Sequence, residues 1–324
     1  MNILGPDYLV FGVDDLAGCR QFLLDYGLRE QENGFFSALD GTGVLLRERD
    51  DPSLPAALPS GSQLRETVYG VADSTTLEVI AETLRRDREV KLGADGVLRC
   101  VDDAGFALGF RVSQRQPLQR EGEKINAPGD LAGRPVNQTG ASADMAAEPR
   151  SLSHVVYFVP DAARAEAFYQ RLGFVCTDRF THVGPFLRPA GTQDHHTLFL
   201  IQAPPFMTGI EHFTFHLGGP TELMMAGSRF QQKGIRPSGG RGAISWDRTG
   251  SGTSTARSGV ISNMTPIWIS TTITGSRAKR CRGPITHNTS CWDIVRNGPP
   301  VRITPADGSS VPCRQSGRGP GTGI

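Results

Sequence analysis

The chain has 324 residues, a formal net charge of +1 and 38% hydrophobic residues, which is enough for one large or two medium domains with buried cores. The charge is uneven, because residues 238–324 hold 11 basic and 3 acidic residues while the part before them is net acidic. No apolar run approaches the roughly 18 residues that cross a bilayer, and Asp7 and Asp14 interrupt the window where a signal peptide needs an apolar core, so we expect a cytoplasmic protein with no membrane partner.

The first 114 residues predict a unit of strands with a helix after the first strand. An apolar run of strand length begins at Tyr8 and is followed by Asp15, a residue type that caps helices. Residues 16–26 then carry aromatic and aliphatic side chains at helical spacing, and Gly27 stands at the C-cap position. Further strand-like runs cover 43–47 and 67–71.

Residues 115–150 are rich in Pro, Gly, Ala, Gln and charge, which is typical of an interdomain linker. After this segment the first pattern recurs at an offset of about 146 residues, because Tyr8 aligns with His154 and Phe22 with Phe168. The second copy predicts one helix and two strands, at 162–172, 197–202 and 211–217. We therefore expect two copies of one ancestral module.

Three cysteines lie before residue 238. Cys19, Cys100 and Cys176 are widely spaced and form no metal or disulfide motif. We expect them to be buried free thiols in a reducing compartment.

Residues 238–324 differ in composition from the rest of the chain. They contain no Leu, Glu, Phe or Tyr, and Gly, Ser and Thr make up roughly two residues in five. No ordinary folded continuation has this composition, so we expect a disordered or misfolded tail. The alternative is a basic arm for nucleic acid, but its basic residues are scattered among few aromatic ones, so we expect no nucleic-acid partner.

Four segments of the second copy carry a family resemblance. They are LSHVVYFVPD from Leu152, AFYQRLGF from Ala167, DHHTLFLI from Asp194 and GIEHFTFHLGG from Gly209. In this order and spacing they resemble the vicinal oxygen chelate superfamily, whose two-domain members include the extradiol ring-cleavage dioxygenases. The resemblance covers about residues 1–237.

This resemblance implies an α+β fold of two tandem domains, each made of paired βαβββ modules that form a funnel-like barrel. It implies a domain without metal at 1–114, a linker at 115–150 and an incomplete metal-binding domain at 151–237, before the tail at 238–324. It also implies that the protein forms a homo-oligomer.

Histidines are confined almost entirely to the second copy. None of the 7 lies in the first copy, and six fall between residues 154 and 216. His154 and His212 stand on separate predicted strands, whereas the first copy has Tyr8 and approximately Val68 at these places. Each could be a core histidine, but two imidazoles with one carboxylate form the facial triad that suits Fe(II). The resemblance implies that His154 and His212 bind Fe(II), with Mn(II) the less favoured metal.

A neighbouring pair of histidines supplies the predicted acid and base. In the resemblance, His195 aligns with the histidine that serves this role, which suits an imidazole because its pKa lies near neutral pH. His196 competes with it, since alternation along a strand sends only one of two neighbours into a pocket. His216, Phe186 and Phe206 are weaker candidates for the substrate pocket, and ordinary core packing explains the two phenylalanines equally well.

The carboxylate that would complete the site, a Glu in the resembling dioxygenases, is missing at its expected place. Glu211 precedes His212, and neighbouring strand residues point to opposite faces, so we expect Glu211 to be a poor substitute. Back-translating residues 243–275 with a shift of one base permits the family's His, Tyr and Glu in order. We therefore hypothesise a one-base frame change near Pro237 or Ser238. We expect the second sheet to lack its last strands, and this chain to fold poorly and be inactive.

The reaction implied by the resemblance is cleavage of a catechol by O₂ beside its two hydroxyls, which gives a ring-opened semialdehyde. One alternative is another metal enzyme of the superfamily, such as a glyoxalase-like isomerase. A second alternative is a binding protein that sequesters a small molecule without chemistry. The histidine pair in DHHT and the fused first copy without histidines favour the dioxygenase.

Overall fold

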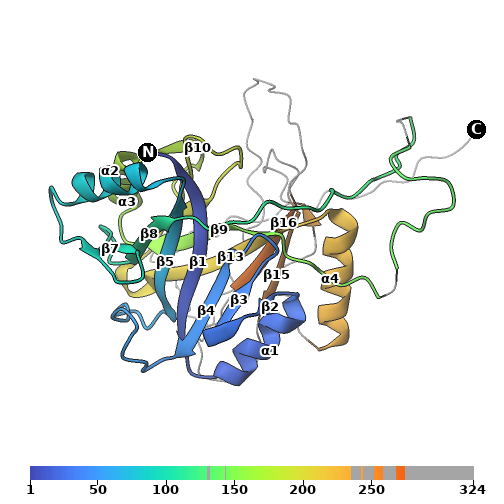
Figure 1. Ribbon diagram of the computed structural model, residues 1–324, viewed down its shortest axis with the longest axis horizontal. Coiled ribbons are helices and arrows are strands. Elements are labelled where there is room, and N and C mark those ends of the chain that lie inside the picture. The colour runs from blue at the N-terminus through green and yellow to red at the C-terminus, as the bar shows by residue number, and fades with distance from the viewer. Residues whose placement is uncertain (130–131, 143, 235–241, 244–251, 258–267, 274–324) are drawn as a thin grey trace, which may run out of the picture. The chain divides into compact units, whose positions relative to one another are not determined.

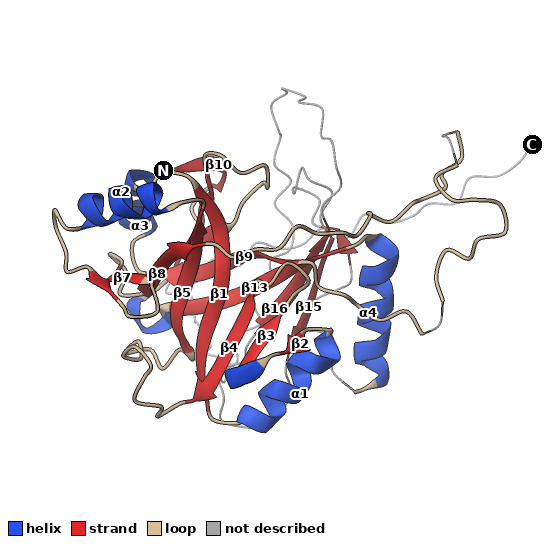
Figure 2. Ribbon diagram, viewed as in Figure 1, coloured by secondary structure: helices blue, strands red, loops and turns tan. Residues whose placement is uncertain are grey.

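The computed structural model describes residues 1–129, 132–142, 144–234, 242–243, 252–257 and 268–273. Within these ranges the chain forms two eight-stranded mixed sheets accompanied by four α-helices (Figure 1, Figure 2). All of these elements belong to one unit, residues 1–279. The arrangement is the α+β fold class that the sequence predicts.

The first sheet has the strand order β2-β3-β4-β1-β5-β8-β7-β6. At its centre β1 pairs in parallel with β4 and antiparallel with β5. In chain order the elements of this half are β1 (Ile3–Val13), α1 (Leu16–Tyr26), β2 (Arg29–Glu30), the 3-10 helix η1 (Glu32–Gly34), β3 (Phe35–Ser37), β4 (Gly43–Glu48), β5 (Leu64–Val71), α2 (Ser74–Leu84), β6 (Lys91–Leu92), β7 (Leu98–Val101) and β8 (Ala107–Val112).

The second sheet has the strand order β10-β11-β12-β9-β13-β16-β15-β14. Here β9 pairs in parallel with β12 and antiparallel with β13. The elements of this half are β9 (Ser151–Val159), α3 (Ala162–Arg171), β10 (Phe174–Phe180), β11 (Gly184–Pro189), β12 (Leu198–Gln202), the 3-10 helix η2 (Pro205–Met207), β13 (Gly209–Leu217), α4 (Pro220–Gln232), β14 (Gly242–Ala243), β15 (Gly252–Arg257) and β16 (Trp268–Ile273).

Both sheets have the same strand order, with each strand of the second sheet in the place of a counterpart in the first. The registers also match, because Val10 pairs with Glu66 in the first sheet and Val156 pairs with His212 in the second. Glu66 rather than Val68 is therefore the counterpart of His212, which corrects the alignment made from the sequence. Duplication of one module would produce this correspondence.

The helices that follow β1 and β9 begin where the sequence predicts. The side chain of Asp15 accepts a hydrogen bond of 2.9 Å from the backbone N–H of Gly18, and α1 ends at Gly27, whose φ is 104°. The side chain of Asp161 accepts a matching bond of 2.9 Å from Arg164 at the start of α3. Each cap satisfies a backbone donor that the first turn of a helix leaves free.

One hydrophobic core includes residues from both halves of the chain. The rings of Phe11 and Phe213 lie 5.5 Å apart, and Phe106 stacks on Tyr157 at 4.3 Å. The hydroxyl of Tyr157 is also hydrogen bonded to that of Thr67. Since burying one such aromatic side chain contributes about 1.5–3 kcal/mol, this core fixes β9 and its histidine against the first half.

The edge of β13 carries a partner that the sequence analysis does not expect. β16 pairs in parallel with β13 from Phe213 to Leu217, and β15 pairs with β16. The expectation that the second sheet lacks its last strands is therefore wrong for the described residues. The physical reason is that an open edge offers unpaired N–H and C=O groups to any segment rich in strand-forming Thr, Ile and Trp. The remainder of 238–324 lies outside the described residues, so the predicted frame change stays a prediction.

Three further expectations concern the linker, the cysteines and the membrane. Between β8 and β9, the described residues of 115–150 contain no helix or strand. Cys19 and Cys100 are buried free thiols as predicted, but Cys176 is exposed, because it lies on β10 at the edge of the second sheet. Among the described helices, none has both the length and the apolar character needed to cross a bilayer.

Candidate metal centre

His154 and His212 meet at the centre of the second sheet. His154 lies on β9 opposite Thr214 of the antiparallel strand β13, so it is a diagonal neighbour of His212. The two Nε2 atoms are 3.3 Å apart, and the ring centroids are 5.4 Å apart. His154 is buried and His212 is partly exposed. The structure thus brings together the two residues that the sequence singles out as metal ligands.

The opposite nitrogen of each ring has a partner of its own. Nδ1 of His154 lies 2.9 Å from Oγ1 of Thr214 and 3.3 Å from Oγ of Ser153. Nδ1 of His212 contacts Oε2 of Glu211. A proton on Nδ1 in both rings would satisfy these partners and leave both Nε2 lone pairs directed at a shared point. Sequence reasoning did not select Thr214, although its position two residues after His212 on one strand was the available signal.

Glu211 does not follow the simple alternation expected of a strand. The register between β13 and β9 shifts between Ile210 and His212, which is the signature of a bulge. The extra residue places the Glu211 carboxylate beside His212 rather than on the opposite face. Burial raises the pKa of Glu211, but the neighbouring His212 charge and hydrogen bond bring the net pKa below its usual value. The expectation that Glu211 points to the face opposite His212 is therefore wrong.

His196, the competitor of His195, is the ring that packs on the ligand pair. Its centroid lies 4.3 Å from that of His154. His195 lies behind it, with the two Nδ1 atoms 3.0 Å apart and Nε2 of His195 3.7 Å from Asp178. Burial and then the neighbouring histidines hold the pKa values of His154 and His196 well below the ordinary value. Both rings are therefore neutral at pH 7, and each keeps a nitrogen lone pair.

The weaker pocket candidates have different outcomes. Phe186 is buried, and its ring lies 4.9 Å from His196. Phe206 is 76% exposed on η2, where Pro204 and Pro205 follow the end of β12, so its place in a substrate pocket stays a prediction. His216 is separated from His212 by a second register shift and lies 3.7 Å from Asp194 instead.

The two imidazoles fit the chemistry of a divalent metal site. Imidazole nitrogen is a common ligand of Fe, Mn and Zn ions, and two nitrogens bound to one ion at about 2.1 Å lie roughly 3 Å apart. The Nε2 separation of 3.3 Å agrees with this requirement. Across the described stretches of the chain, however, no group of three or more His, Cys, Asp or Glu is placed to hold an ion. A carboxylate must therefore be added or moved to complete a facial triad.

Sequence comparisons find relatives of the half of the chain that carries these histidines. Residues 151–251 match the family described as the Glyoxalase/Bleomycin resistance protein/Dioxygenase superfamily. Over 120 residues, 36% of this chain, the sequence is 31% identical to Metapyrocatechase 2 of Cupriavidus necator. Residues 151–251 are therefore similar to this superfamily, of which the vicinal oxygen chelate dioxygenases are part. The matched stretch spans 37% of the length of that relative.

Solved structures share the fold of most of the chain. The 2,3-dioxygenase LapB from Pseudomonas sp. KL28 has a TM-score of 0.61 at 16% identity, with 88% of this chain and 97% of that one covered. The Mn(II)-bound glyoxalase from Novosphingobium aromaticivorans has a TM-score of 0.60 at 18% identity, with 84% and 82% covered. At these identities the likeness establishes the fold, and the chemistry has to be argued from the site.

Proposed function

We propose that the second half of the chain serves metal-dependent extradiol cleavage of a catechol by O₂. The observation that carries the proposal is the pair of Nε2 atoms 3.3 Å apart on adjacent strands, each ring held through its Nδ1. The likeness to Metapyrocatechase 2 supports a dioxygenase over other members of the superfamily. The product is a ring-opened semialdehyde that contains both atoms of O₂.

His154 and His212 are the proposed protein ligands. Fe(II) is the proposed ion, and Mn(II) is the alternative because a Mn(II)-bound glyoxalase shares the fold. A divalent ion at this point supplies a Lewis acid for the diol oxygens and a path for electrons from the diol to O₂. The residues around the ligands then have two tasks, which are to move protons and to seat the ring.

His196 is the proposed base for the catechol hydroxyl. Its neutral ring packs 4.3 Å from His154, so a proton acceptor stands next to the ligand pair. His195, which the sequence favours, is hydrogen bonded through its Nδ1 to Nδ1 of His196, and its Nε2 lies 3.7 Å from Asp178, which a small movement of either side chain would bring within hydrogen-bonding distance. We assign the first transfer to His196 and the relay to His195.

An aromatic wall beside these histidines supports an aromatic substrate. Phe186 and Phe199 stack at 3.9 Å with an angle of 9° between their planes, and Phe186 also contacts His196. A flat apolar wall next to a polar cluster suits a molecule with one hydrophobic ring and two adjacent hydroxyls.

The third ligand is proposed to be a carboxylate that the region after residue 237 would encode once the one-base frame change is reversed. Glu211 is the alternative source, because its carboxylate already contacts His212. The two sources make different demands on the chain. If the ligand comes from the shifted region, this chain is inactive and a frame-corrected chain is active.

The test uses both chains. Each is reconstituted with Fe(II) without air and mixed with catechol, and the yellow ring-fission product is followed by absorbance. We expect product from the frame-corrected chain and none from this chain or from a His154→Ala variant of the corrected one. No product from either chain under saturating Fe(II) would overturn the proposal. Isomerisation of a hemithioacetal by the same preparations would support the glyoxalase-like alternative, which the shared fold with a Mn(II)-bound glyoxalase favours.

The proposed setting is the cytoplasm, where free thiols persist. Cys19, Cys100 and Cys176 are all unpaired, which agrees with a reducing compartment. A homo-oligomer is likewise a proposal drawn from the resemblance, and sedimentation of the purified chain would test it.

A further inference from the structure

The first half of the chain contains a cavity of about 470 Å³ on the face of its sheet that corresponds to the histidine site of the second. Tyr8 lines it and is the counterpart of His154 in the repeat. Leu45 and Phe35 also line it, and their registers make them the counterparts of Phe199 and Phe186. The same concave face therefore recurs in both halves, with different side chains.

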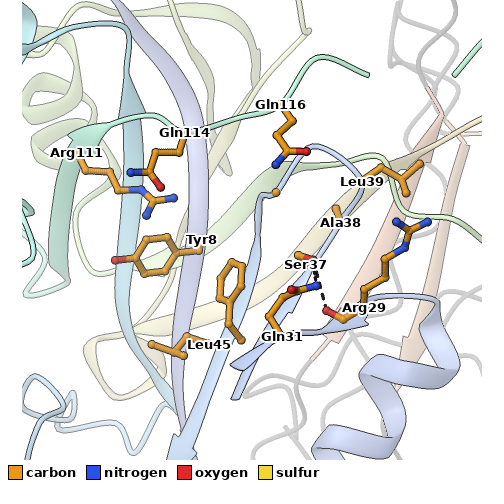
Figure 3. Close-up of a pocket in the computed structure, with 12 residues that line it drawn as sticks. Tyr8, Arg29, Gln31, Ser37, Ala38, Leu39, Leu45, Arg111, Gln114 and Gln116 are labelled. Carbon is orange, nitrogen blue, oxygen red and sulfur yellow. Dashed lines mark hydrogen bonds between the residues drawn. The ribbon is translucent and has the colours of Figure 1, made fainter. Parts of the chain in front are cut away.

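The charge of this cavity is positive. Its lining includes Arg29 and Arg111, which lie on opposite sides of it (Figure 3), and no Asp or Glu among the described residues. Asp7 is completely buried and forms ion pairs with both Arg111, at 3.1 Å, and Arg115, at 2.9 Å. Two guanidinium groups on one carboxylate leave an excess positive charge on this side, whereas Arg29 is already paired with Glu148 at 3.6 Å. The Arg111 side is therefore the one that favours an anionic ligand.

Arg111 is held in place for such a ligand. Its Nε donates to Asp7, which leaves the two Nη groups on the cavity side, and the guanidinium lies 4.8 Å from the ring centre of Tyr8 (Figure 3). The Asp7 carboxylate packs over Gly70, where a Cβ would come within 2.2 Å of Oδ1. A planar guanidinium fixed in this way suits a carboxylate, which it can bind through two parallel hydrogen bonds.

The other walls suit an aromatic body with polar substituents. Phe35 packs edge-on against Tyr8 with ring centroids 6.0 Å apart, and Leu45 adds apolar surface. The amide of Gln114 lies beside Arg111 (Figure 3), and Gln116 also lines the cavity. Amides both donate and accept hydrogen bonds, so they can serve ring hydroxyls as well as a carboxylate.

We propose that this cavity is a binding site for a small aromatic carboxylate, with the carboxylate on Arg111 and the ring against Tyr8, Phe35 and Leu45. The site is separate from the histidine pair and goes beyond the proposed ring cleavage, since it needs no metal. Its volume lies within the range of about 300–1,000 Å³ that is usual for small-molecule sites.

Benzoate is the probe, measured with the full chain by isothermal titration calorimetry. Benzamide has the same ring without the charge, and acetate has the charge without the ring. We expect saturable benzoate binding, with both comparison compounds at least about tenfold weaker, because each lacks one of the two contacts. Equal affinity for benzoate and benzamide, or no saturable benzoate binding, would overturn the proposal.

Variants locate the site. Arg111→Gln should weaken benzoate binding by about tenfold or more. Arg115→Gln also removes a partner of Asp7 and one positive charge, but Arg115 does not line the cavity, so this variant should weaken binding clearly less than Arg111→Gln. Leu45→Trp should block the cavity, and the exposed Leu92→Trp should not.

A final variant separates the two halves. His154→Ala combined with His212→Ala should leave benzoate affinity unchanged. Loss of benzoate binding in that variant, or equal losses with Arg111→Gln and Arg115→Gln, would refute the assignment to the first half.

Discussion

Replacing Glu211 with Gln should weaken the binding of a divalent metal to His154 and His212 by roughly 10- to 100-fold. The Glu211 carboxylate contacts Nδ1 of His212, so it fixes the ring and keeps Nε2 toward His154. Glutamine can still accept a hydrogen bond through its amide oxygen but carries no charge to raise the basicity of the imidazole. The expected loss corresponds to about 1.4–2.7 kcal/mol of binding free energy.

The assay is calorimetric titration with Mn(II), which is stable in air, on this chain and its variants. His212→Ala should abolish measurable binding, and Thr214→Val should give a loss similar to that of Glu211→Gln because Thr214 holds Nδ1 of His154. Glu222→Gln is the control, since its carboxylate contacts the backbone of Gly218 and Glu148 away from the pair.

Two results would refute the reasoning about Glu211. An unchanged Mn(II) affinity in Glu211→Gln would show that the contact does not orient His212. A loss as complete as that of His212→Ala would show that the carboxylate is itself a metal ligand, in which case the bulge in β13 supplies the third ligand.

The remaining predictions concern proton transfer, pH and packing. In an active, frame-corrected chain His196→Gln should lower kcat by about 10²–10⁴-fold while metal affinity stays constant, and His195→Gln should lower it less. Burial raises the pKa of Asp102 to about 6, above its ordinary value of 3.8, so the folded state binds this proton more tightly than the unfolded state. This stability is fully present below about pH 4 and is lost as the pH rises through 6, and Asp102→Asn should remove about 3 kcal/mol of that pH dependence in urea denaturation. Gly70→Ala should lower the free energy of unfolding by about 1–3 kcal/mol, because its Cβ would lie 2.2 Å from Oδ1 of Asp7.

Matched variants check the last two predictions. Asp103→Asn removes a neighbouring carboxylate that is partly exposed and paired with Arg88, so it should keep the wild-type dependence on pH between 4 and 7. Gly122→Ala adds a methyl group whose nearest neighbour is 3.9 Å away and should be nearly neutral in urea denaturation. Parallel pH curves for the wild type and Asp102→Asn, or equal stability losses for the two glycine variants, would contradict the structural explanation.

Much of the fold follows from local sequence signals. Asp15 and Asp161 cap the helices they precede, and Gly27 ends the first helix with a positive φ. These features depend on interactions within a few residues, so the local sequence is enough to predict them. The repeat then places His154 and His212 on adjacent strands, which is why their proximity could also be predicted.

The sequence does not specify features that depend on a long-range contact or on an irregular strand. Alternation failed at Glu211 because a bulge inserts one residue, and a bulge depends on the partner strand as much as on its own sequence. The choice between His195 and His196 depends on which ring reaches β9, and neither residue carries that information alone. The exposure of Phe206 likewise depends on how the chain turns after β12, where two prolines follow.

The matching registers of the two sheets make each half a template for redesigning the other. Tyr8 and Glu66 occupy the places of His154 and His212, so Tyr8→His with Glu66→His would graft a second imidazole pair onto the first sheet. Glu66 now holds Arg99 at 2.8 Å, so Arg99→Gln would have to accompany the graft. Such a chain would present one ligand geometry in two different surroundings, and their metal affinities would separate the contribution of the ligands from that of the walls around them.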